Sequence, residues 1–151
     1  MAANPAMVES FRIDHKKLDA PSVRKAGRLC GPKGDIVTKF DLRLVKPNTS
    51  ALPTAALHTL EHILATRLRE ILDDVIDLSP MGCRTGFYLA LFGEREEAEI
   101  KSALIDSLKK ALAAKWEDVP GVDEKSCGNY RDHSLHAARE FAKVFLEGLE
   151  K

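Results

Sequence analysis

Hydrophobic residues in the second quarter of the chain recur with the period of an α-helix. They fall at three- and four-residue spacings, which place them on one side of a helix: Leu57, Leu60, Ile63, Leu64, Leu68, Ile71 and Leu72. We therefore expect a helix over Pro53–Leu72, capped at its start by Ser50 or Thr54.

The segment before this helix shows strict alternation instead. Within Ile36–Val45, apolar side chains take one face and charged side chains the other: Phe40, Leu42 and Leu44 against Asp41 and Arg43. This pattern predicts a half-buried strand. Ser22–Cys30 predicts a second strand, and the turn signal Gly31–Gly34 between the two predicts an antiparallel hairpin.

The rest of the chain mixes both kinds of element. Val75–Ser79 and Gly86–Phe92 predict strands, Glu94–Lys115 and Ser134–Leu149 predict amphipathic helices, and Trp116–Asn129 predicts irregular structure. Strands and helices do not alternate regularly, so parallel βαβ units are not expected. The fold class predicted is α+β, with an antiparallel β-sheet packed with helices on one face in a single domain.

The composition of the chain limits which binding partners and which cellular compartment are expected for the protein. The 151 residues suit one domain over residues 1–151, with residues 1–6 as a loose N-terminal end. The 23 basic and 23 acidic residues cancel, so no nucleic-acid partner is expected, and no apolar run is long enough to span a membrane. Cys30, Cys83 and Cys127 are an odd number of thiols. Since Met1–Glu9 lacks the layout of a signal peptide, we expect reduced thiols and a cytoplasmic protein.

The motif His58-Thr59-Leu60-Glu61-His62 suggests a metal site on the first predicted helix. Positions four apart project to the same side of a helix, so both imidazoles can bind one ion, with Glu61 beside them. The alternative is a pair of partly exposed polar histidines beside a solvated glutamate.

A catalytic site of this type usually has three protein ligands and one open position, so a third ligand is needed from elsewhere. The candidates besides carboxylates are three cysteines and three histidines: Cys30, Cys83, Cys127, His15, His133 and His136. Cys127 is the best of them, because it precedes Gly128 in an irregular segment where the thiolate can approach an ion. An inert buried thiol remains the alternative.

Cys83 is the second candidate for chemistry. It lies between two predicted strands in the glycine-flanked turn Pro80–Gly86, and the neighbouring Arg84 would favour its thiolate. A thiol with a lowered pKa suits proton transfer or nucleophilic attack. The alternative is that the turn only needs a small apolar residue.

Five separated blocks of the sequence resemble one known family. They are Val8–Phe11 with His15, Lys39–Arg43, His58–His62, Asp77–Tyr88, and Cys127-Gly128 followed by His133–Leu135. Together they resemble the LuxS-type S-ribosylhomocysteine lyases, in the expected order and spacing from Val8 to about Phe145. These enzymes release homocysteine and 4,5-dihydroxy-2,3-pentanedione, the precursor of autoinducer-2.

The resemblance implies a role for each matched residue. His58, His62 and Cys127 would bind the metal, and Glu61 and Cys83 would be the catalytic acid and base. Six residues would line the substrate pocket: Ser10, Phe11, His15, Arg43, Asp77 and Gly128. The resemblance also implies one divalent metal ion per subunit, with Fe(II) in the working enzyme and zinc possible in isolated protein. It further implies a homodimer whose active sites lie at the subunit interface.

The implied reaction moves a sugar carbonyl from C1 to C3 and then eliminates the sulfur on C5. Each migration step removes one proton and returns another, which explains the need for two acid–base groups beside a Lewis-acidic metal. The chain has no G-x-G-x-x-G motif after a strand, in agreement with a redox-neutral route.

The rival interpretation is a small H-x-x-E-H metallopeptidase, in which Glu61 activates water and Cys83 is dispensable.

Overall fold

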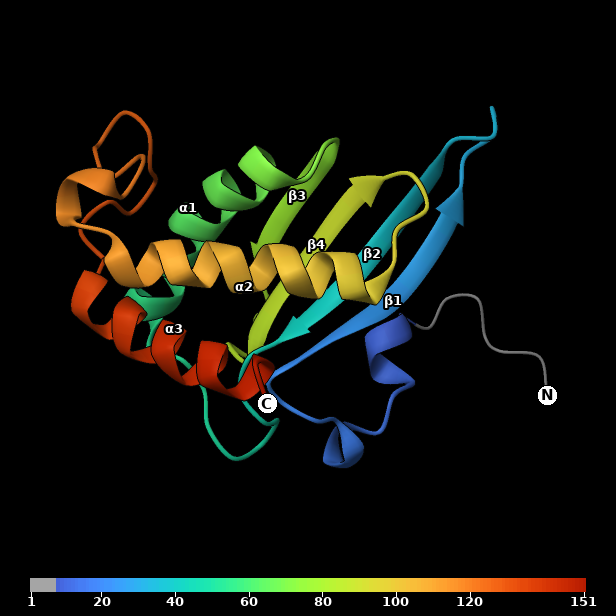
Figure 1. Ribbon diagram of the computed structural model, residues 1–151, viewed down its shortest axis with the longest axis horizontal. Coiled ribbons are helices and arrows are strands. Elements are labelled where there is room, and N and C mark those ends of the chain that lie inside the picture. The colour runs from blue at the N-terminus through green and yellow to red at the C-terminus, as the bar shows by residue number, and fades with distance from the viewer. Residues whose placement is uncertain (1–7) are drawn as a thin grey trace.

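The computed structural model describes residues 8–151, so the expected loose end at residues 1–6 lies outside the described residues. The main elements in chain order are β1 (Ser22–Cys30), β2 (Ile36–Arg43), α1 (Thr54–Ile71), β3 (Val75–Pro80), β4 (Gly86–Phe92), α2 (Glu97–Ala113) and α3 (Leu135–Leu149). Three short 3-10 turns accompany them: η1 (Glu9–Phe11), η2 (His15–Lys17) and η3 (Trp116–Asp118). Figure 1 shows how these elements are arranged.

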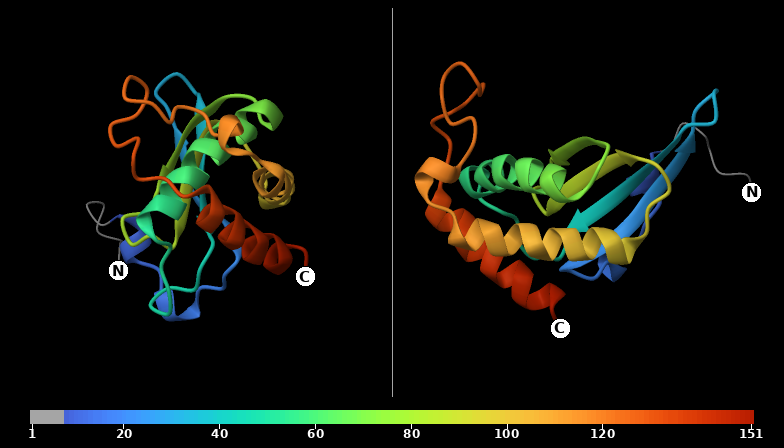
Figure 2. Two further views of the ribbon diagram at one scale, coloured as in Figure 1. Left: turned by 90° about the vertical axis from the view of Figure 1, so that its left-hand side faces the viewer. Right: turned by 45° about the horizontal axis from the view of Figure 1, so that its top comes forward.

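The four strands form one antiparallel sheet in the order β1-β2-β4-β3. Helix α1 carries the chain from β2 to β3, past β4, and the three α-helices cover one face of the sheet (Figures 1 and 2). The core lies between these layers, and its strand residues are fully buried: Phe40, Leu42, Phe87, Leu89 and Leu91. The predicted α+β fold with helices on one face is confirmed.

The ends of several elements differ from the prediction. Strand β2 stops at Arg43, because Leu44 and Val45 both donate their backbone N–H to Thr85 O and leave the ladder. No side chain caps α1, so the expected cap is wrong, and its first residue is Thr54. Ser134 is the cap of α3, where its hydroxyl accepts from the backbone of the first turn, and not its first residue.

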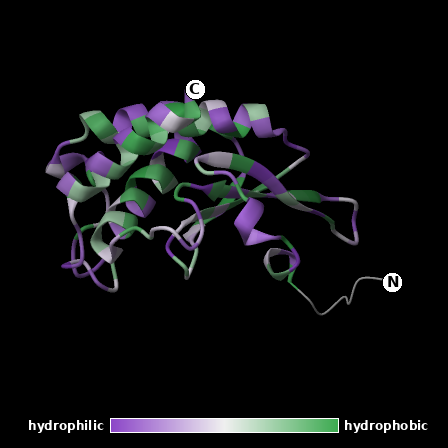
Figure 3. Ribbon diagram, turned by 90° about the horizontal axis from the view of Figure 1, so that it is seen from below, coloured by the Kyte–Doolittle hydropathy of each residue, from purple (hydrophilic) through white to green (hydrophobic). Residues whose placement is uncertain are grey.

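The face of the sheet opposite the helices is covered only in part. The N-terminal turns η1 and η2 lie on this side (Figure 3). Asp41 and Arg43, which alternation placed on a half-exposed face, are 1% and 2% exposed.

At the other end of the same sheet face, paired residues of β1, β2 and β4 form an apolar row, in which Leu29 lies opposite Val37 and Val37 opposite Phe92. Leu29 is 70% exposed and Phe92 48%.

Among the helices within residues 8–151, none combines the length and the apolar character needed to cross a bilayer.

Candidate active site

Three donor atoms from two distant segments converge on one point. His58 and His62 lie one turn apart on α1, and their Nε2 atoms are 3.1 Å apart. Cys127 comes from the loop between η3 and α3. Its Sγ lies 3.3 Å from Nε2 of His58 and 3.9 Å from Nε2 of His62. The fold thus brings together the three residues that the sequence suggested as ligands.

Backbone carbonyls fix the orientation of both imidazoles. Nδ1 of His58 donates to Asp132 O at 2.9 Å, and Nδ1 of His62 donates to Pro120 O at 2.7 Å. Because a carbonyl only accepts, each Nδ1 carries the proton and each Nε2 keeps its lone pair. The turn that aims Pro120 O needs glycine, since Gly121 has φ 67° and lies directly against the His62 ring.

The donor set has the dimensions of a tetrahedral metal site. Two lone pairs facing each other across 3.1 Å repel unless a cation or a proton lies between them. Metal bonds of about 2.05 Å to nitrogen and about 2.3 Å to sulfur separate tetrahedral N–N pairs by about 3.3 Å and N–S pairs by about 3.6 Å. The distances among His58, His62 and Cys127 lie on either side of these values. These residues can therefore hold one divalent ion.

His133 belongs to the same cluster, whose four ligand-type atoms lie within 4.8 Å of one another. Its ring stacks on that of His58, with centroids 3.9 Å apart and planes inclined by 22°. The rings of His58 and His62 stand at 84°. Since an imidazole lone pair lies in the plane of its ring, two stacked rings do not aim at one ion. His133 lies beside the donors without the orientation of a ligand.

Hydrogen bonds hold His133 in this position. The hydroxyl of Thr59 donates to Ala55 O at 2.9 Å and accepts from Ser134 N at 3.0 Å. Nδ1 of His133, 3.0 Å from the same oxygen, is therefore the donor. Its buried Nε2 has no partner among the described residues. Burial, followed by the two histidines of α1, lowers the pKa of His133 to about 4, so the ring is neutral at pH 7.

Glu61 lies on the flank of the metal-binding cluster. It is half-buried and lines an open pocket of about 250 Å³ together with His62 and with residues of α1 and of the loop between η3 and α3: Ala65, Thr66, Pro120, Gly121 and Ser126. A carboxylate in this position can exchange protons with a molecule bound beside the donors.

Cys83 occupies the tip of the turn between β3 and β4. Arg84 donates its backbone N–H to Met81 O at 2.9 Å and adopts φ 60°, in the left-handed region. Gly86 follows, where a Cβ atom would lie 2.1 Å from Leu42 O. Glycine therefore allows β4 to start directly against β2, which brings the exposed Cys83 thiol over the open face of the sheet.

The residues around Cys83 form a second pocket, of about 290 Å³. It is lined by Ser10, Phe11, His15, Arg43, Met81, Gly82, Cys83 and Tyr88. Four of the six residues expected to bind substrate are among them, from η1, η2 and β2. The ring of Phe11 is 78% exposed at its rim.

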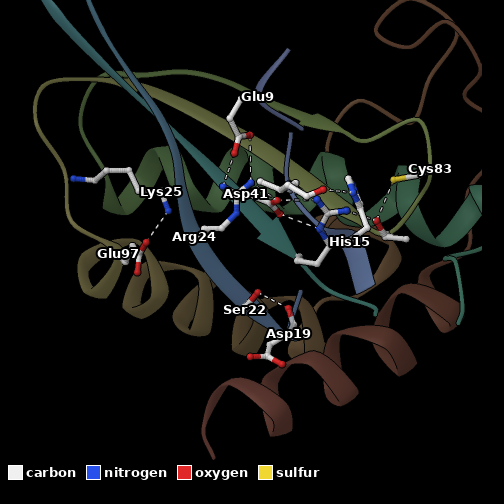
Figure 4. Close-up of polar contacts among 12 residues, drawn as sticks. Glu9, His15, Asp19, Ser22, Arg24, Lys25, Asp41, Cys83 and Glu97 are labelled. Atoms are coloured by element: carbon white, nitrogen blue, oxygen red, sulfur yellow. Dashed lines mark hydrogen bonds and ion pairs between the residues drawn. The ribbon is translucent and has the colours of Figure 1, made fainter. Parts of the chain in front are cut away.

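A chain of ion pairs, buried at Asp41 and Arg43 and partly exposed at Arg24 and Glu9, supports the floor of this pocket. Asp41 accepts from Nε and Nη2 of Arg43 at 3.1 and 2.7 Å, and from Arg24 at 3.0 Å. Arg24 also donates to Glu9 at 2.6 Å, and Figure 4 shows Glu9, Arg24 and Asp41 side by side. Two guanidinium groups thus balance two carboxylates. The arrangement holds the Arg43 side chain rigidly where the pocket needs a fixed cation.

The positive charge of Arg43 affects the Cys83 thiol, and the side chain of Thr85 lies between the two groups. Partial burial raises the pKa of Cys83, but hydrogen bonds with Thr85 and the charge of Arg43 outweigh it and hold the pKa below its ordinary value. The expectation that Arg84 favours the thiolate is wrong. Its guanidinium donates to Leu52 O at 3.1 Å, on the helix side of the turn.

The two halves of the expected site do not meet within one chain. Glu61 and Cys83 line different pockets, and those pockets have no residue in common. Asp77 and Gly128 are exposed and line neither of them. Asp77 accepts a short hydrogen bond from Ser79, and space around Gly128 is open.

Sequence reasoning missed the residues that hold others in place. Thr59 lies inside the metal motif, yet its role depends on Ser134 and His133 from a segment more than seventy residues away. Glu9 and Arg24 carried no periodic signal that marks them as partners of Asp41. The available clue was the pair of charged residues at Asp41 and Arg43 inside an otherwise apolar strand.

Comparisons with known proteins show the family of the chain. The family model described as S-Ribosylhomocysteinase (LuxS) matches residues 8–151. A relative named S-ribosylhomocysteine lyase from Streptococcus pneumoniae (strain Hungary19A-6) is 52% identical over 142 residues, 93% of this chain and 89% of the relative. One of the same name from Lacticaseibacillus paracasei (strain ATCC 334) is 55% identical over 142 residues, 93% and 90% of the two chains. The chain belongs to the S-ribosylhomocysteinase (LuxS) family.

Proposed function

We propose that this protein cleaves S-ribosylhomocysteine to homocysteine and 4,5-dihydroxy-2,3-pentanedione. The observation that carries the proposal is the convergence of His58, His62 and Cys127 on one point beside Glu61. A three-donor site with an open side is the arrangement that metal-assisted chemistry on a bound substrate requires. The names of the relatives supply the substrate.

The chemistry of the substrate explains why two proton-transfer groups are needed. The opened sugar has its carbonyl at C1, whereas the sulfur is bonded to C5. Elimination is facile only when the carbonyl is at C3, because C4 then becomes acidic and the sulfur lies on the β carbon. The carbonyl must therefore move from C1 to C2 and from C2 to C3 before a C4 proton is removed and homocysteine leaves with the C–S electron pair.

Glu61 and Cys83 are the groups proposed to move these protons. Glu61 lies beside the metal donors, and Cys83 presents a thiol with a lowered pKa in the second pocket. Each group removes a proton from one carbon or oxygen and returns it to the neighbouring one, so every step is redox-neutral. Ser10, Phe11, His15 and Arg43 would hold the rest of the substrate near Cys83.

A divalent cation held by His58, His62 and Cys127 would supply Lewis-acid polarisation of the sugar oxygens. The thiolate and imidazole donors suit both zinc and Fe(II). We propose Fe(II) as the working ion and zinc as an ion that isolated protein can carry, since this donor set binds zinc more tightly.

We also propose that the protein is a homodimer whose active sites are shared. Glu61 and Cys83 lie in separate pockets of one chain, and a second copy can bring a Cys83 pocket to each metal centre. The partly covered sheet face, with the exposed Leu29 and Phe92 on either side of the half-buried Val37, offers an apolar surface of the kind that subunit contacts bury. Asp77 and Gly128 would reach the substrate only in such an assembly.

The direct test is release of a free thiol from S-ribosylhomocysteine by metal-replete, reduced protein. Wild-type protein should produce homocysteine, whereas Glu61→Gln and Cys83→Ala should each lower the rate by about 10²- to 10⁴-fold with the metal retained. A wild-type protein without thiol release under these conditions would refute the assignment.

The same variants address the peptidase interpretation. Against it stands the position of Cys127, which occupies the place where such an enzyme would more typically use a distant glutamate. A peptidase would tolerate Cys83→Ala, because the thiol lies outside the pocket of Glu61. Peptide hydrolysis that survives this substitution would favour the rival.

A further inference from the structure

The hydroxyl of Thr85 lies between the only buried cation of the second pocket and the thiol of Cys83. Its Oγ1 is 2.8 Å from Nη1 of Arg43 and 3.1 Å from Sγ of Cys83. Thr85 is 4% exposed, so its hydroxyl is largely shielded from water. The backbone of Thr85 is also anchored, because its carbonyl accepts from the backbone N–H groups of Leu44 and Val45.

The chemistry of the three groups fixes the direction of the hydrogen bonds. A guanidinium can only donate, so the Thr85 oxygen accepts from Arg43. The single hydroxyl proton of Thr85 is then free, and the nearest acceptor is the sulfur of Cys83. A hydroxyl that donates to sulfur favours the thiolate over the thiol.

We propose that Thr85 is a positioning residue that relays the charge of Arg43 to Cys83, favouring the thiolate form of the sulfur and holding it at the pocket. Its oxygen is polarised by the guanidinium, which strengthens the bond that it donates. Arg43 is in turn fixed by Asp41, which also binds Arg24. The consequence for turnover rests on the proposed function, but the ionisation of the thiol is a property of the turn itself.

The other charged groups around Cys83 do not supply this effect. His15 and Tyr88 line the pocket from η2 and β4, and the ring of His15 is turned with Nδ1 towards Ile13 O at 3.2 Å. Arg84 points to the helix side of the turn. The carboxylates below the pocket are paired with arginines and do not raise the pKa of Cys83 directly.

Substitutions of Thr85 can test the role of its hydroxyl group separately from the shape of the turn. Thr85→Val keeps the shape of the side chain but removes the donor, and Thr85→Ser keeps the donor. The readout is the alkylation rate of Cys83 by iodoacetamide between pH 5 and 10, followed by mass spectrometry of the Cys83 peptide. This peptide-specific signal distinguishes Cys83 from Cys30 and Cys127. Thiolate absorbance near 240 nm, with Cys83→Ala as the blank, gives a second measurement.

We expect Thr85→Val to shift the midpoint of alkylation upwards, so that the thiolate fraction near neutral pH falls about tenfold. Thr85→Ser should stay close to the wild type. Thr85→Ala also lacks the donor and carries the test if the valine variant fails to fold. Equal midpoints in the wild type and a folded variant without the hydroxyl would overturn the proposal. Because the assay needs no substrate, its outcome is independent of whether the wild type shows lyase activity.

Discussion

At the scale of single residues, the orientation of the ring planes decides which side chains of the cluster could hold an ion. His133 offers a ligand-type atom within 4.8 Å of those of the other three residues, yet its ring is stacked on His58. His62 and Cys127 approach His58 with their donor atoms instead. Proximity alone therefore gives four candidate metal ligands. The orientation of their donor atoms selects three of them, which leaves one coordination position of a tetrahedral ion open.

This difference predicts distinct effects on metal binding. Cys127→Ser should lose the bound ion, because it removes a thiolate donor. His133→Asn should keep about one ion per subunit and weaken binding by at most about 10- to 100-fold, the range typical of residues that only support ligands. Metal analysis after dialysis against a weak chelator measures both.

Cobalt substitution provides the control for this comparison. Co(II) bound by the His133→Asn variant should retain the sulfur-to-metal charge-transfer absorption that arises from Cys127, whereas Cys127→Ser should lack it. A His133→Asn variant that loses its metal as completely as Cys127→Ser would contradict the three-ligand set.

At the scale of elements, the turn between β3 and β4 determines where Cys83 lies. Gly86 touches the backbone of β2 at a distance that leaves no room for a side chain. Gly82, on the other side of Cys83, has open space around it. A methyl group added at Gly86 should therefore destabilise the protein more than one added at Gly82.

We predict that Gly86→Ala destabilises the protein by about 1–3 kcal/mol or more, because β4 must move away from β2. Gly82→Ala should change the free energy of unfolding by less than about 0.5 kcal/mol. Urea unfolding followed by circular dichroism compares the two variants. Equal losses of stability would show that the close approach of the strands is not what the turn requires.

The elements themselves were largely predictable, because each depends on local periodicity. Alternation over β2 and the helical spacing over α1 place most of the same side chains in the core that the structure buries. Ile71 is the exception: its place on the apolar stripe of α1 predicted burial, but at the last turn of the helix it is 41% exposed. The burial of Asp41 and Arg43 was not predictable in this way. It depends on η1 and η2, which lie far away in the sequence and fold back over the strand (Figure 3).

Only part of the candidate site was predictable from the sequence. His58 and His62 lie in one recognisable motif and Cys127 was the best candidate for a third ligand, and the fold brings these three side chains together. Whether they bind a metal ion stays a prediction. The partner of Cys83 was misassigned to the adjacent Arg84, whereas the charge that reaches the thiol comes from Arg43 on another strand. Such contacts depend on strand register, which local patterns do not specify.

At the scale of the whole molecule, one chain places the residues of the proposed site in two separate pockets. The metal donors and Glu61 lie on one pocket, while Cys83 and four expected substrate-binding residues lie on another. In a dimer with twofold symmetry, each half of one subunit can meet the complementary half of its partner, which creates two equivalent sites. Light scattering should give the mass of a dimer, twice 16.7 kDa.

The most direct test of this account is complementation between two inactive variants. Glu61→Gln and Cys83→Ala subunits are co-expressed with different affinity tags, and the mixed dimer is purified by both tags in succession. If a site takes Glu61 from one subunit and Cys83 from the other, one of the two sites in the mixed dimer keeps both groups. Thiol release from S-ribosylhomocysteine should then recover to about half of the wild-type rate. A pure mixed dimer as inactive as either parent variant would contradict the shared site.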